Sequence, residues 1–523
     1  MKAITSDEMR SLEEFAVKLG IPVRILMEIA GMKVANIAAN EIKRVRSICV
    51  ICGSGGNGGD GFVAARYLNN AGIRTDVFLT SPEDKISSQD ALENLKILKS
   101  LKMRTTELSS DDSFKKLKSS VTDSDLVIDA IYGIGFRGEV KDPVSRAIDI
   151  INNAKKEIKD KRPYSVLSVD VPSGADASTG EAASKCVEAD MTVTFEYPKI
   201  GLLKYPAGKF AGKIITTSIG IPKPNPVEPQ LPMQSKETVS AEKKSEGVQV
   251  TDPRFVASVI PRRKADLNKG DCGKVLVVAG SSGMMGAAVL TATSALRTGS
   301  GLVTLCVPEN IKDIVNSMSL ETVVAGMDEL DEKLKECDVI AIGPGLSKGK
   351  NIGKLVNSLI LSKKTKAPMV IDADGLNAIS DPSILKKSKR EIVITPHPGE
   401  FSRLTGKKIE EIQRDRTGNA SRFADKYGVT MVLKGAYTVI AGKGKIFINP
   451  TGNPGMASAG VGDVLTGIIA SLIGQGIDPF NSAVAGAYVH GMAGNLAASI
   501  KGEHGLIASD IIDSIPYTLA SIV

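Results

Sequence analysis

The sequence contains no tryptophan and few other aromatic residues. Phenylalanine, tyrosine and tryptophan together make up 4% of its 523 residues, whereas proteins that hold single-stranded nucleic acid stack its bases on aromatic side chains. A formal net charge of +7 is small for a chain of this length. Its lysine pairs, such as 363–364 and 386–387, lie in polar, helix-like stretches that favour a solvated face. We therefore expect no nucleic-acid partner.

Long apolar runs are also missing. No stretch approaches the roughly 20 consecutive apolar residues that a membrane-spanning helix needs. Met1 is followed by Lys2 and a polar, helix-forming segment, without the apolar core of a secretory signal peptide. These absences predict a cytoplasmic protein without a membrane partner.

Metal-binding side chains are scarce, with three histidines and six cysteines in the whole chain. Cys49 and Cys52 have the CxxC spacing, but they lie in an apolar, strand-like segment, where residues three apart face opposite sides. No second cysteine pair and no nearby histidine would complete a zinc site. We therefore interpret them as structural cysteines, as expected in a reducing cytoplasm.

The length of the chain predicts more than one domain. Residue 221 opens a stretch with proline at nearly alternate positions, and lysine, glutamate and serine dominate the residues after it. Such a composition cannot form a regular helix or ladder and buries little apolar surface. It predicts a linker at 221–250 between an N-terminal domain at 1–220 and a C-terminal domain at 251–523.

Both domains alternate short apolar strands with helical patterns, which is typical of α/β proteins whose parallel sheets carry helices on both faces. The strands predicted in the first domain are 47–52, 75–79, 126–130 and 165–171. Those predicted in the second are 274–279, 302–307, 339–342, 368–371, 392–395 and 431–434. Ligands of such sheets bind at the carboxyl ends of the strands, and the glycine-rich segments of this sequence lie there.

A glycine-rich loop, residues 53–61, follows the first strand and precedes a helix predicted at 62–70. Glycines let backbone N–H groups approach an anion at a helix N-terminus. The loop lacks the lysine of a Walker A motif. Three of its glycines match the GxGxxG pattern of dehydrogenases, but Asp60 within the loop would repel a pyrophosphate. The acid that binds ribose should end the next strand, whereas Asp76 stands at its start. A dehydrogenase and a purely structural turn remain as alternatives.

Two further strand ends carry polar side chains. Asp129 ends the third predicted strand, while Asp170 and Ser173 lie at the end of the fourth. Together with Asn57 in the glycine loop, they should surround one crevice. Oxygen ligands without thiolate or imidazole suit a hard cation, and a carboxylate beside the crevice suits proton transfer. The alternative for Asp170 is a simple helix N-cap.

These features resemble the N-terminal domain of the NAD(P)HX epimerase family, over residues 1–220. The segments that carry the resemblance are 53–61, 129–138, 169–174, 189–195 and 199–203. It implies a Rossmann-like, three-layer α/β/α fold, proton transfer by Asp170, and potassium bound by Asn57, Asp129 and Ser173. The substrate contacts that it implies are Gly56, Asn57, Gly58, Gly59, Asp60, Gly133, Ile134, Gly135, Phe136, Arg137, Gly138, Glu139 and Asp170. Gly56 and Ile29 depart from the family, which usually has asparagine at both positions.

The most specific segment of the second domain is 453–467, where glycines precede Asp463 and an apolar helix comes after it. A helix N-terminus with free N–H groups can hold a phosphoryl group in transfer, and the aspartate can take a hydroxyl proton. The alternative is a glycine turn in which Asp463 caps the helix. His397 and Glu400 lie just after a strand, and Glu400 is a candidate magnesium ligand, directly or through water. Lys434 ends another strand beside a glycine, as a nucleotide contact would.

Together these segments resemble the ribokinase-like superfamily and, within it, the ADP-dependent NAD(P)HX dehydratase branch, over residues 251–523. The discriminating segments are 270–280, 372–377, 397–400 and 453–467. The contacts that the resemblance implies for the hydrated nicotinamide nucleotide are Ala287, Gly345, His397 and Asp463. Those that it implies for the adenine nucleotide are Lys434, Gly435, Ala436, Tyr437, Thr438 and Gly462. Val461 stands where the family usually has a small polar residue.

The combined hypothesis is a repair enzyme for nicotinamide nucleotides. The first domain is expected to interconvert R- and S-NAD(P)HX, with K⁺ as cofactor. The second is expected to dehydrate S-NAD(P)HX to NAD(P)H with Mg²⁺ and ADP, releasing AMP and phosphate. The choice of ADP over ATP rests on the resemblance alone. The alternative is a C-terminal small-molecule kinase with a non-catalytic N-terminal nucleotide-binding module. We expect a homo-oligomer.

Overall fold

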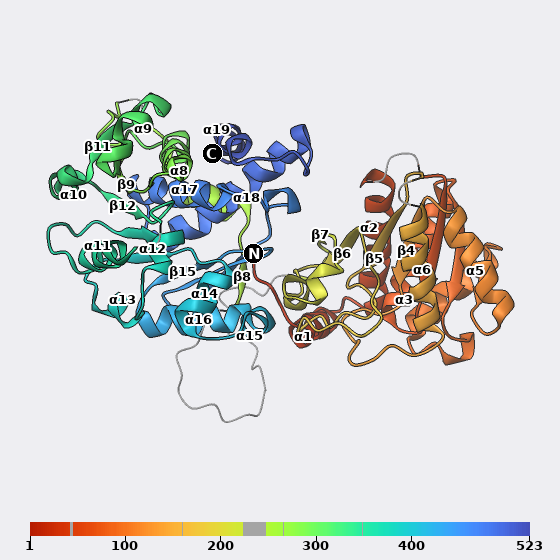
Figure 1. Ribbon diagram of the computed structural model, residues 1–523. Helices are drawn as coiled ribbons and strands as arrows, with labels where there is room; N and C mark the ends of the chain where they lie inside the picture. Colours follow the sequence, from red (N-terminus) through yellow and green to blue (C-terminus); the bar gives the residue numbers. More distant parts are fainter. Residues whose placement is uncertain (42–44, 159–160, 223–246, 265, 348) are drawn as a thin grey trace. The chain divides into compact units, whose positions relative to one another are not determined.

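The computed structural model describes residues 1–41, 45–158, 161–222, 247–264, 266–347 and 349–523. These residues form two compact units, one of residues 2–222 and the other of residues 247–523 together with Met1 (Figure 1). Most of the predicted linker, 223–246, lies outside the described residues. Its two ends belong to the units, because Ile221 is buried in the first core and Gln249–Val250 forms a strand of the second sheet.

The first unit is built around a seven-stranded parallel sheet in the order β3-β2-β1-β4-β5-β6-β7. Its strands are β1 (Ser47–Cys52), β2 (Arg74–Leu79), β3 (Thr105–Glu107), β4 (Leu126–Ala130), β5 (Ser165–Val169), β6 (Met191–Phe195) and β7 (Lys213–Thr217). Its helices are α1 (Ser6–Lys18), α2 (Val23–Glu41), α3 (Gly56–Asn70), α4 (Gln89–Ser100), α5 (Asp111–Asp123) and α6 (Val144–Ile158), with 3-10 turns η1 (Glu83–Lys85), η2 (Ile200–Leu203) and η3 (Ala207–Lys209). The strand order reverses between β1 and β4, which places a ligand crevice at their carboxyl ends.

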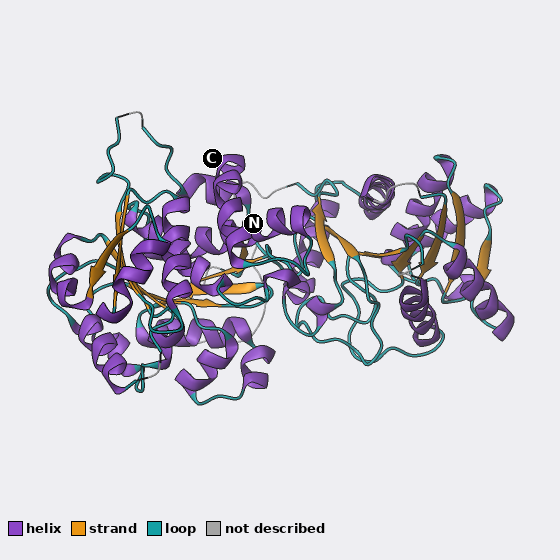
Figure 2. Cartoon of the chain, turned by 45° about the horizontal axis from the view of Figure 1, so that its top comes forward, coloured by secondary structure: helices purple, strands orange, loops and turns teal. Residues whose placement is uncertain are grey.

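Successive side chains of β1 point to opposite faces of the sheet, and this explains the three layers of the unit. Ile48, Val50 and Cys52 enter one apolar cluster with α2, α3 and α4, whereas Cys49 and Ile51 enter another with α5 and α6. Figure 2 shows helices on both sides of the strands. The two cysteines of the CxxC pair therefore face opposite layers, and all six cysteines are free. Burial raises the pKa of both thiols, as expected for structural cysteines.

The second unit contains a ten-stranded sheet in the order β11-β10-β9-β12-β13-β14-β15-β16-β17-β8. Its strands are β8 (Gln249–Val250), β9 (Lys274–Val278), β10 (Leu302–Val307), β11 (Val323–Gly326), β12 (Val339–Ile342), β13 (Met369–Ile371), β14 (Ile392–Ile394), β15 (Thr430–Leu433), β16 (Thr438–Gly442) and β17 (Lys445–Asn449). The strands from β11 to β15 run parallel, and β16 is antiparallel to both of its neighbours. The order reverses between β9 and β12, so a second crevice opens there.

Helices cover both faces of this sheet as well. They are α7 (Pro253–Val259), α8 (Met285–Thr298), α9 (Lys312–Met318), α10 (Leu330–Glu336), α11 (Lys350–Leu361), α12 (Ala373–Asn377), α13 (Ser383–Lys387), α14 (Pro398–Thr405), α15 (Ile409–Arg414), α16 (Arg416–Tyr427), α17 (Val461–Gly474), α18 (Pro479–Lys501) and α19 (Ala508–Ile522). The 3-10 turns are η4 (Glu309–Ile311), η5 (Met327–Glu329) and η6 (Pro454–Met456). One core lies between the sheet and α8, α17 and α18, and a second joins α17 to α18 and α19. None of the helices in the described ranges is long and apolar enough to cross a membrane.

The predicted strands are all present. Those predicted at 47–52, 126–130, 302–307 and 339–342 have the predicted bounds, and the others end within two residues of them. The strands that were not predicted are β3, β6, β7, β8, β11, β16 and β17. Four of these, β3, β7, β8 and β11, are the edge strands of the two sheets. Edge strands are partly exposed and lack the continuous apolar pattern of strands covered on both faces.

Candidate active sites

The side chain of Asp129 links the carboxyl ends of β4 and β5 by hydrogen bonds. The residue is fully buried in β4. Its carboxylate accepts hydrogen bonds from Ser168 Oγ at 2.8 Å, Ser173 N at 2.9 Å and Ser173 Oγ at 2.5 Å. Burial raises the pKa of Asp129, and the hydrogen bonds that it accepts oppose this effect. Asp129 therefore fixes the segment after β5 against the end of β4.

The glycine-rich segment has two different structural roles. The helix predicted at 62–70 already begins at Gly56, so the segment forms the first turns of α3. A Cβ at Gly53 would lie 2.0 Å from Ile131 O, and one at Gly58 would lie 2.0 Å from Gly53 O. These two glycines are thus required by backbone packing. By contrast, a Cβ at Gly55 or Gly56 would meet nothing within 4 Å. The open part of the segment presents the N-terminus of α3, where a ligand anion can bind.

The predicted potassium ligands lie on three neighbouring elements. Asn57 stands in the first turn of α3 and faces Gly133, where an added Cβ would lie 3.1 Å from Asn57 Oδ1. Its Nδ2 is buried and has no hydrogen-bond partner in the described part of the chain. Asp129 and Ser173 are bonded to each other. Their oxygens and the single carboxylate have the chemistry that a hard monovalent cation needs.

Asp170 stands directly after β5 in a strained conformation, with φ of +62°. Its Oδ1 accepts hydrogen bonds from Thr194 Oγ1 at 3.0 Å, Phe195 N at 3.3 Å and Lys199 Nζ at 2.7 Å. No described helix begins at Asp170, so the alternative of a simple N-cap is wrong. The Asp170 carboxylate is instead held through one of its oxygens, Oδ1, which accepts all three of these hydrogen bonds.

The other predicted epimerase contacts lie in α3 and in the segment after β4. Phe136 stacks on Tyr132 with ring centroids 4.9 Å apart, and Ile134 packs against the core. Arg137 lies 3.6 Å from Asp7 of α1, while Glu139 accepts a hydrogen bond from Ser184 Oγ at 2.8 Å. The remaining contacts are Gly59 and Asp60 in α3, and Gly133, Gly135 and Gly138 in the segment after β4. The segment 133–139 is therefore held at both ends.

The dehydrogenase alternative lacks its ribose-binding acid. Asp76 accepts a hydrogen bond at 3.2 Å from Ser120 of α5, so it faces a covering helix and not the crevice. Met27 and Gly31 of α2 pack against the glycine segment, and the departure at Ile29 lies between them on this helix. The Ile29 side chain packs against the core, and a Cβ at Gly220 would lie 3.3 Å from it.

In the second unit, Asp463 lies in the first turn of α17. The turn before it needs glycine, because the N-cap residue Gly460 has φ of +84°. Burial raises the pKa of Asp463 to about 7, with further contributions from the carboxylates of Asp372, Asp374 and Glu400, while Lys434 opposes the shift. A carboxyl group with such a pKa can accept a proton near neutral pH.

A buried network lies directly beside Asp463. Lys434 Nζ donates to Asp372 Oδ1 at 2.7 Å, and Thr466 Oγ1 donates to Asp372 Oδ2 at 2.8 Å. Burial lowers the pKa of Lys434, but the charges of Asp372 and Glu400 outweigh it and the pKa is raised. A Cβ at Gly462 would lie 3.2 Å from Lys434 Nζ. Gly462, Lys434 and Asp463 are thus brought together, as predicted for neighbours in one site.

His397 caps helix α14. Its Nδ1 accepts hydrogen bonds from Gly399 N at 3.0 Å and Glu400 N at 3.3 Å, so the proton of the neutral ring belongs on Nε2. Glu400 Oε2 in return accepts a hydrogen bond from His397 N at 2.8 Å. The Glu400 carboxylate is buried and committed to this capping box, and direct ligation of magnesium through it stays a prediction.

The remaining predicted dehydratase residues form two groups. A Cβ at Gly345 would lie 3.0 Å from Ala287 Cβ, so these two substrate contacts are neighbours. Gly435, Ala436 and Tyr437 form the partly exposed turn between β15 and β16, and Thr438 is the first residue of β16. The Lys434 amine is hydrogen-bonded to Asp372. The turn is therefore the part of residues 434–438 that is most accessible to solvent. Val461, which departs from the family, packs into the apolar cluster around α18 and α19.

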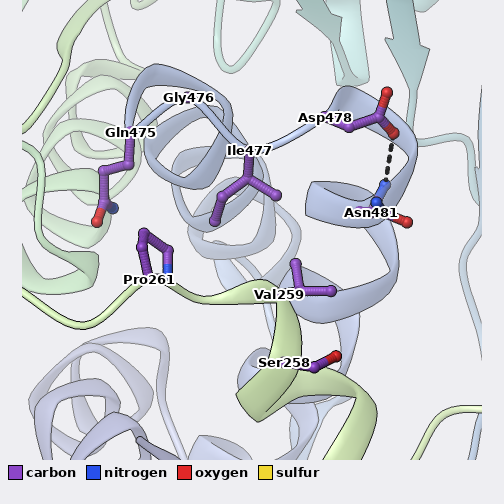
Figure 3. Close-up of a pocket in the computed structure, with 8 residues that line it drawn as sticks. All are labelled: Ser258, Val259, Pro261, Gln475, Gly476, Ile477, Asp478 and Asn481. Atoms are coloured by element: carbon purple, nitrogen blue, oxygen red, sulfur yellow. Dashed lines mark hydrogen bonds between the residues drawn. The ribbon is translucent and has the colours of Figure 1, made fainter.

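A surface hollow of about 390 Å³ lies away from these residues (Figure 3). Its lining residues are Ser258, Val259, Pro261, Gln475, Gly476, Ile477, Asp478 and Asn481. Gln475 is the C-cap of α17, whereas Asp463 lies in its first turn. A 14-residue helix is roughly 20 Å long, so the hollow is remote from Asp463. Asp478 caps α18 by accepting a hydrogen bond from Asn481 N at 3.2 Å.

Comparison with known proteins identifies both units. A family model described as NAD(P)H-hydrate dehydratase matches residues 275–517, and one described as YjeF-related protein N-terminus matches residues 23–201. The bifunctional NAD(P)H-hydrate repair enzyme Nnr of Moorella thermoacetica is 39% identical, over 100% of this chain and 97% of that protein. The chain belongs to the bifunctional NAD(P)H-hydrate repair enzyme family.

Another curated relative agrees with this assignment. The protein of the same name from Escherichia coli is 34% identical to the chain, over 97% of this chain and 92% of that protein. Among solved structures, the ADP/ATP-dependent NAD(P)H-hydrate dehydratase of Bacillus subtilis, co-crystallised with ATP and Mg²⁺, is 31% identical with a TM-score of 0.48. The match covers 53% of this chain and 100% of that chain.

Membership of the family confirms the resemblance predicted for each half of the chain. It also confirms the fold class: a Rossmann-like N-terminal domain and a ribokinase-like C-terminal domain. The pairing of a small-molecule kinase with a non-catalytic module is not supported, because the full-length relatives are named as bifunctional repair enzymes.

Sequence reasoning missed several polar residues of the two sites. Lys199 and Asp372 lie inside segments that carried the family resemblance, but nothing in those segments indicated their buried ion pairs. Thr466 and Glu13 were not singled out at all. Glu13 could have been found from its position on the apolar face of α1, between buried Met9 and Ala16.

Proposed function

We propose that the chain repairs hydrated NADH and NADPH by two reactions on separate units. The first unit interconverts the R and S epimers, and the second dehydrates the S epimer with ADP. The observation that supports this most strongly is the placement of Asp463, a carboxyl group with a pKa of about 7 at the N-terminus of a buried helix.

In the second unit, Asp463 accepts the proton of the C6 hydroxyl as its oxygen attacks the terminal phosphoryl group of ADP. The N–H groups at the start of α17 stabilise the charge of the phosphoryl group, and AMP departs. The lone pair of the ring nitrogen then expels phosphate from C6, and loss of a proton from C5 completes the double bond of the dihydronicotinamide. Lys434 and Thr466 hold Asp372 beside Asp463 and so maintain the electrostatics of the base.

Magnesium is proposed to enter with the phosphates of the nucleotide, where it neutralises the charge that develops on transfer. The turn formed by residues 435–438 and Gly462 would contact the nucleotide, while His397, Ala287 and Gly345 would contact the nicotinamide part. ATP in the same register would bring a further phosphate towards Asp463, which charge repulsion disfavours. We therefore propose ADP as the donor.

In the first unit, Asp170 transfers protons at C6 of the nicotinamide ring. The N-terminus of α3 and the segment 133–139 would bind the phosphates and sugar of the substrate. Potassium would be held by Asn57, Asp129 and Ser173, where it orders the loops around the crevice. The Ser173 hydroxyl donates its proton to Asp129, and its oxygen would keep a lone pair for the ion. We place the enzyme in the cytoplasm as a homo-oligomer.

Incubation of mixed NADHX epimers with the protein, magnesium and either ADP or ATP tests the proposal. Full recovery of NADH with ADP, and formation of AMP and phosphate in equal amounts, would support it. Accumulation of a stable phosphorylated substrate would identify a kinase instead. A clear preference for ATP would leave the reaction intact and overturn the donor. Replacement of K⁺ by tetramethylammonium should slow epimerisation alone.

A further inference from the structure

Asp170 and Lys199 form the centre of a buried cluster of charges. Lys199 is fully buried, and its Nζ donates to Asp170 Oδ1 at 2.7 Å, Thr194 Oγ1 at 3.1 Å and Phe195 O at 2.9 Å. The hydrogen bonds to the Asp170 carboxylate all end on Oδ1, and Oδ2 accepts none from the described residues. One oxygen is therefore fixed, and the other is available to a ligand.

Helix α1 brings a second carboxyl group to this cluster. Met9 and Ala16 are buried, and Glu13 lies four residues after the first and three before the second, on the same face of the helix. The chain before α1 runs beside Lys199, because Ile4 N donates to Pro198 O at 3.0 Å and Ile4 O accepts from Ile200 N at 2.9 Å. The fold thus brings α1 to the side of Lys199, and the charges of Asp170 and Lys199 both act on Glu13.

The cluster has more carboxyl groups than positive charges. Glu13 and Asp60 make no hydrogen bond or ion pair with the described residues, and Asp170 and Lys199 act on both of them electrostatically. Arg10 on α1 is the other cation that acts on Glu13. Several uncompensated negative charges in one buried place are unfavourable, so such a cluster retains protons.

The two carboxyl groups without partners differ in how firmly they hold a proton. Burial, with the charge of Asp170, raises the pKa of Glu13 to about 7 and that of Asp60 well above its ordinary value. Burial therefore favours the protonated form of Asp60, whereas Glu13 can both release and accept a proton near pH 7. A group that exchanges its proton near the working pH is suited to acid–base catalysis.

We propose that Glu13 is the second acid–base residue of the epimerase, which works with Asp170 on the opposite face of the nicotinamide ring. The inference rests on the proposed epimerase function. The C6 hydroxyl takes the proton of Glu13 and leaves as water, while the nitrogen lone pair forms the N1=C6 double bond. A water molecule then adds to the other face of C6 and gives its proton to Asp170, and the lone pair returns to N1. In one turnover Glu13 gives up one proton and Asp170 receives one. A turnover in the opposite direction returns both groups to their starting protonation states.

This assignment explains why two carboxyl groups are needed. Leaving and entering oxygens lie on opposite sides of C6, and inversion requires a proton transfer on each side. A single group could serve only one of the two faces without moving. Lys199 Nζ lies 2.7 Å from Asp170 and so positions the carboxyl group that receives the proton, whereas Glu13 makes no ion pair with the described residues.

Replacement of Glu13 in the full chain tests the inference, with Glu14 as the matched control because it is the exposed neighbour on the same helix. Glu13→Gln should lower kcat of epimerisation about 10²- to 10⁴-fold with little change in KM. Glu13→Asp should restore part of the rate, and Glu14→Gln should match the wild type. Thermal unfolding of the first unit of each variant reports whether that unit is intact.

The pH profile separates catalysis from a structural role. In the wild type, kcat for removal of the hydroxyl should fall as pH rises above about 7, where Glu13 loses its proton. Glu13→Gln should lose this limb, although Asp60, Asp170, Lys199 and Arg10 remain. In water enriched in ¹⁸O, each catalysed epimerisation should place one ¹⁸O at C6, as mass spectrometry would show.

The possible failures are distinct. If the wild type does not epimerise NADHX, the proposed function of the first unit is wrong. If the wild type epimerises and Glu13→Gln keeps its rate and its pH limb, the assignment of Glu13 is overturned. Retention of the original oxygen at C6 during catalysed epimerisation would overturn the two-sided exchange even if the Glu13 variant failed to fold.

Discussion

Asp463 is surrounded by other carboxyl groups, and this environment controls when it can act as a base. Burial and the charge of Asp372 hold its pKa at about 7, against an ordinary value of 3.8. Below that pH the group carries a proton and cannot accept the proton of the substrate. The rate of dehydration is therefore tied to this single equilibrium.

We predict that Asp463→Asn abolishes ADP-driven recovery of NADH. Loss of a general base costs about 10²- to 10⁴-fold in rate, while epimerisation in the separate first unit should stay intact. In the wild type, kcat/KM for dehydration should fall about tenfold per pH unit below pH 7, because the base becomes protonated. Steady-state assays of both reactions between pH 5 and pH 9 check this. Near-normal dehydration by the variant would contradict the role of Asp463.

The same substitution should stabilise the folded protein at high pH. The folded state keeps a proton on Asp463 between pH 3.8 and about 7, which the unfolded chain releases. Stability is therefore lost as pH rises through this window, by at most about 4 kcal/mol. The neutral amide of the variant removes this cost, so calorimetry should show a higher Tm of the second unit at pH 8. At pH 4 wild type and variant should melt alike, and an equal gain at both pH values would exclude this cause.

At the scale of elements, the contact between β1 and α3 depends on glycine at one position and not at its neighbour. A Cβ at Gly58 would lie 2.0 Å from Gly53 O, whereas one at Gly56 would meet nothing within 4 Å. We predict that Gly58→Ala destabilises the first unit by about 1–3 kcal/mol or more and abolishes epimerisation. Gly56→Ala should keep the stability of the wild type. Urea denaturation of both variants checks this, and equal stability would contradict the close approach.

The sequence was sufficient to predict ten strands from their short apolar runs, but it missed β6, which is fully buried although threonine alternates with its apolar residues. It failed for the start of α3, since Gly56, Gly58 and Gly59 have low helix propensity and only packing against β1 and β4 makes them helical. Asp170 and Asp463 could be proposed as proton carriers from the motifs around them, one directly after a strand and one at the start of a helix. Their partners could not, because Lys199 and Lys434 meet Asp170 and Asp372 only in the folded chain.

The edge strand β8 belongs to the second unit, although it lies within the predicted linker. Gln249 pairs with Phe447 and Val250 with Ile448 of β17, and Thr251 N donates to Ile448 O at 3.0 Å. We predict that a fragment of residues 247–523 has a higher Tm than one of residues 251–523, which leaves the edge of β17 unpaired. Thermal unfolding of both fragments measures this. Identical melting would show that β8 adds nothing to the fold.

At the scale of the whole molecule, each unit has its own sheet, core and site. We predict that residues 247–523 alone dehydrate only one epimer of NADHX. The amount of NADH recovered should then match the fraction of the substrate that was supplied as that epimer. Addition of residues 1–222 as a separate chain should restore full recovery. Chromatography of the remaining substrate checks this. Consumption of both epimers at equal rates by the single unit would refute the division of labour.

The two units lie on one polypeptide, and this has a consequence for regulation. Each chain carries one copy of each of the two sites, so the ratio of the two activities cannot be adjusted by gene expression. Any balance between them has to be set by rate constants. The proton equilibria at Glu13 and Asp463, which both have a pKa of about 7, provide one such setting. A shift of pH would then speed one step while it slows the other.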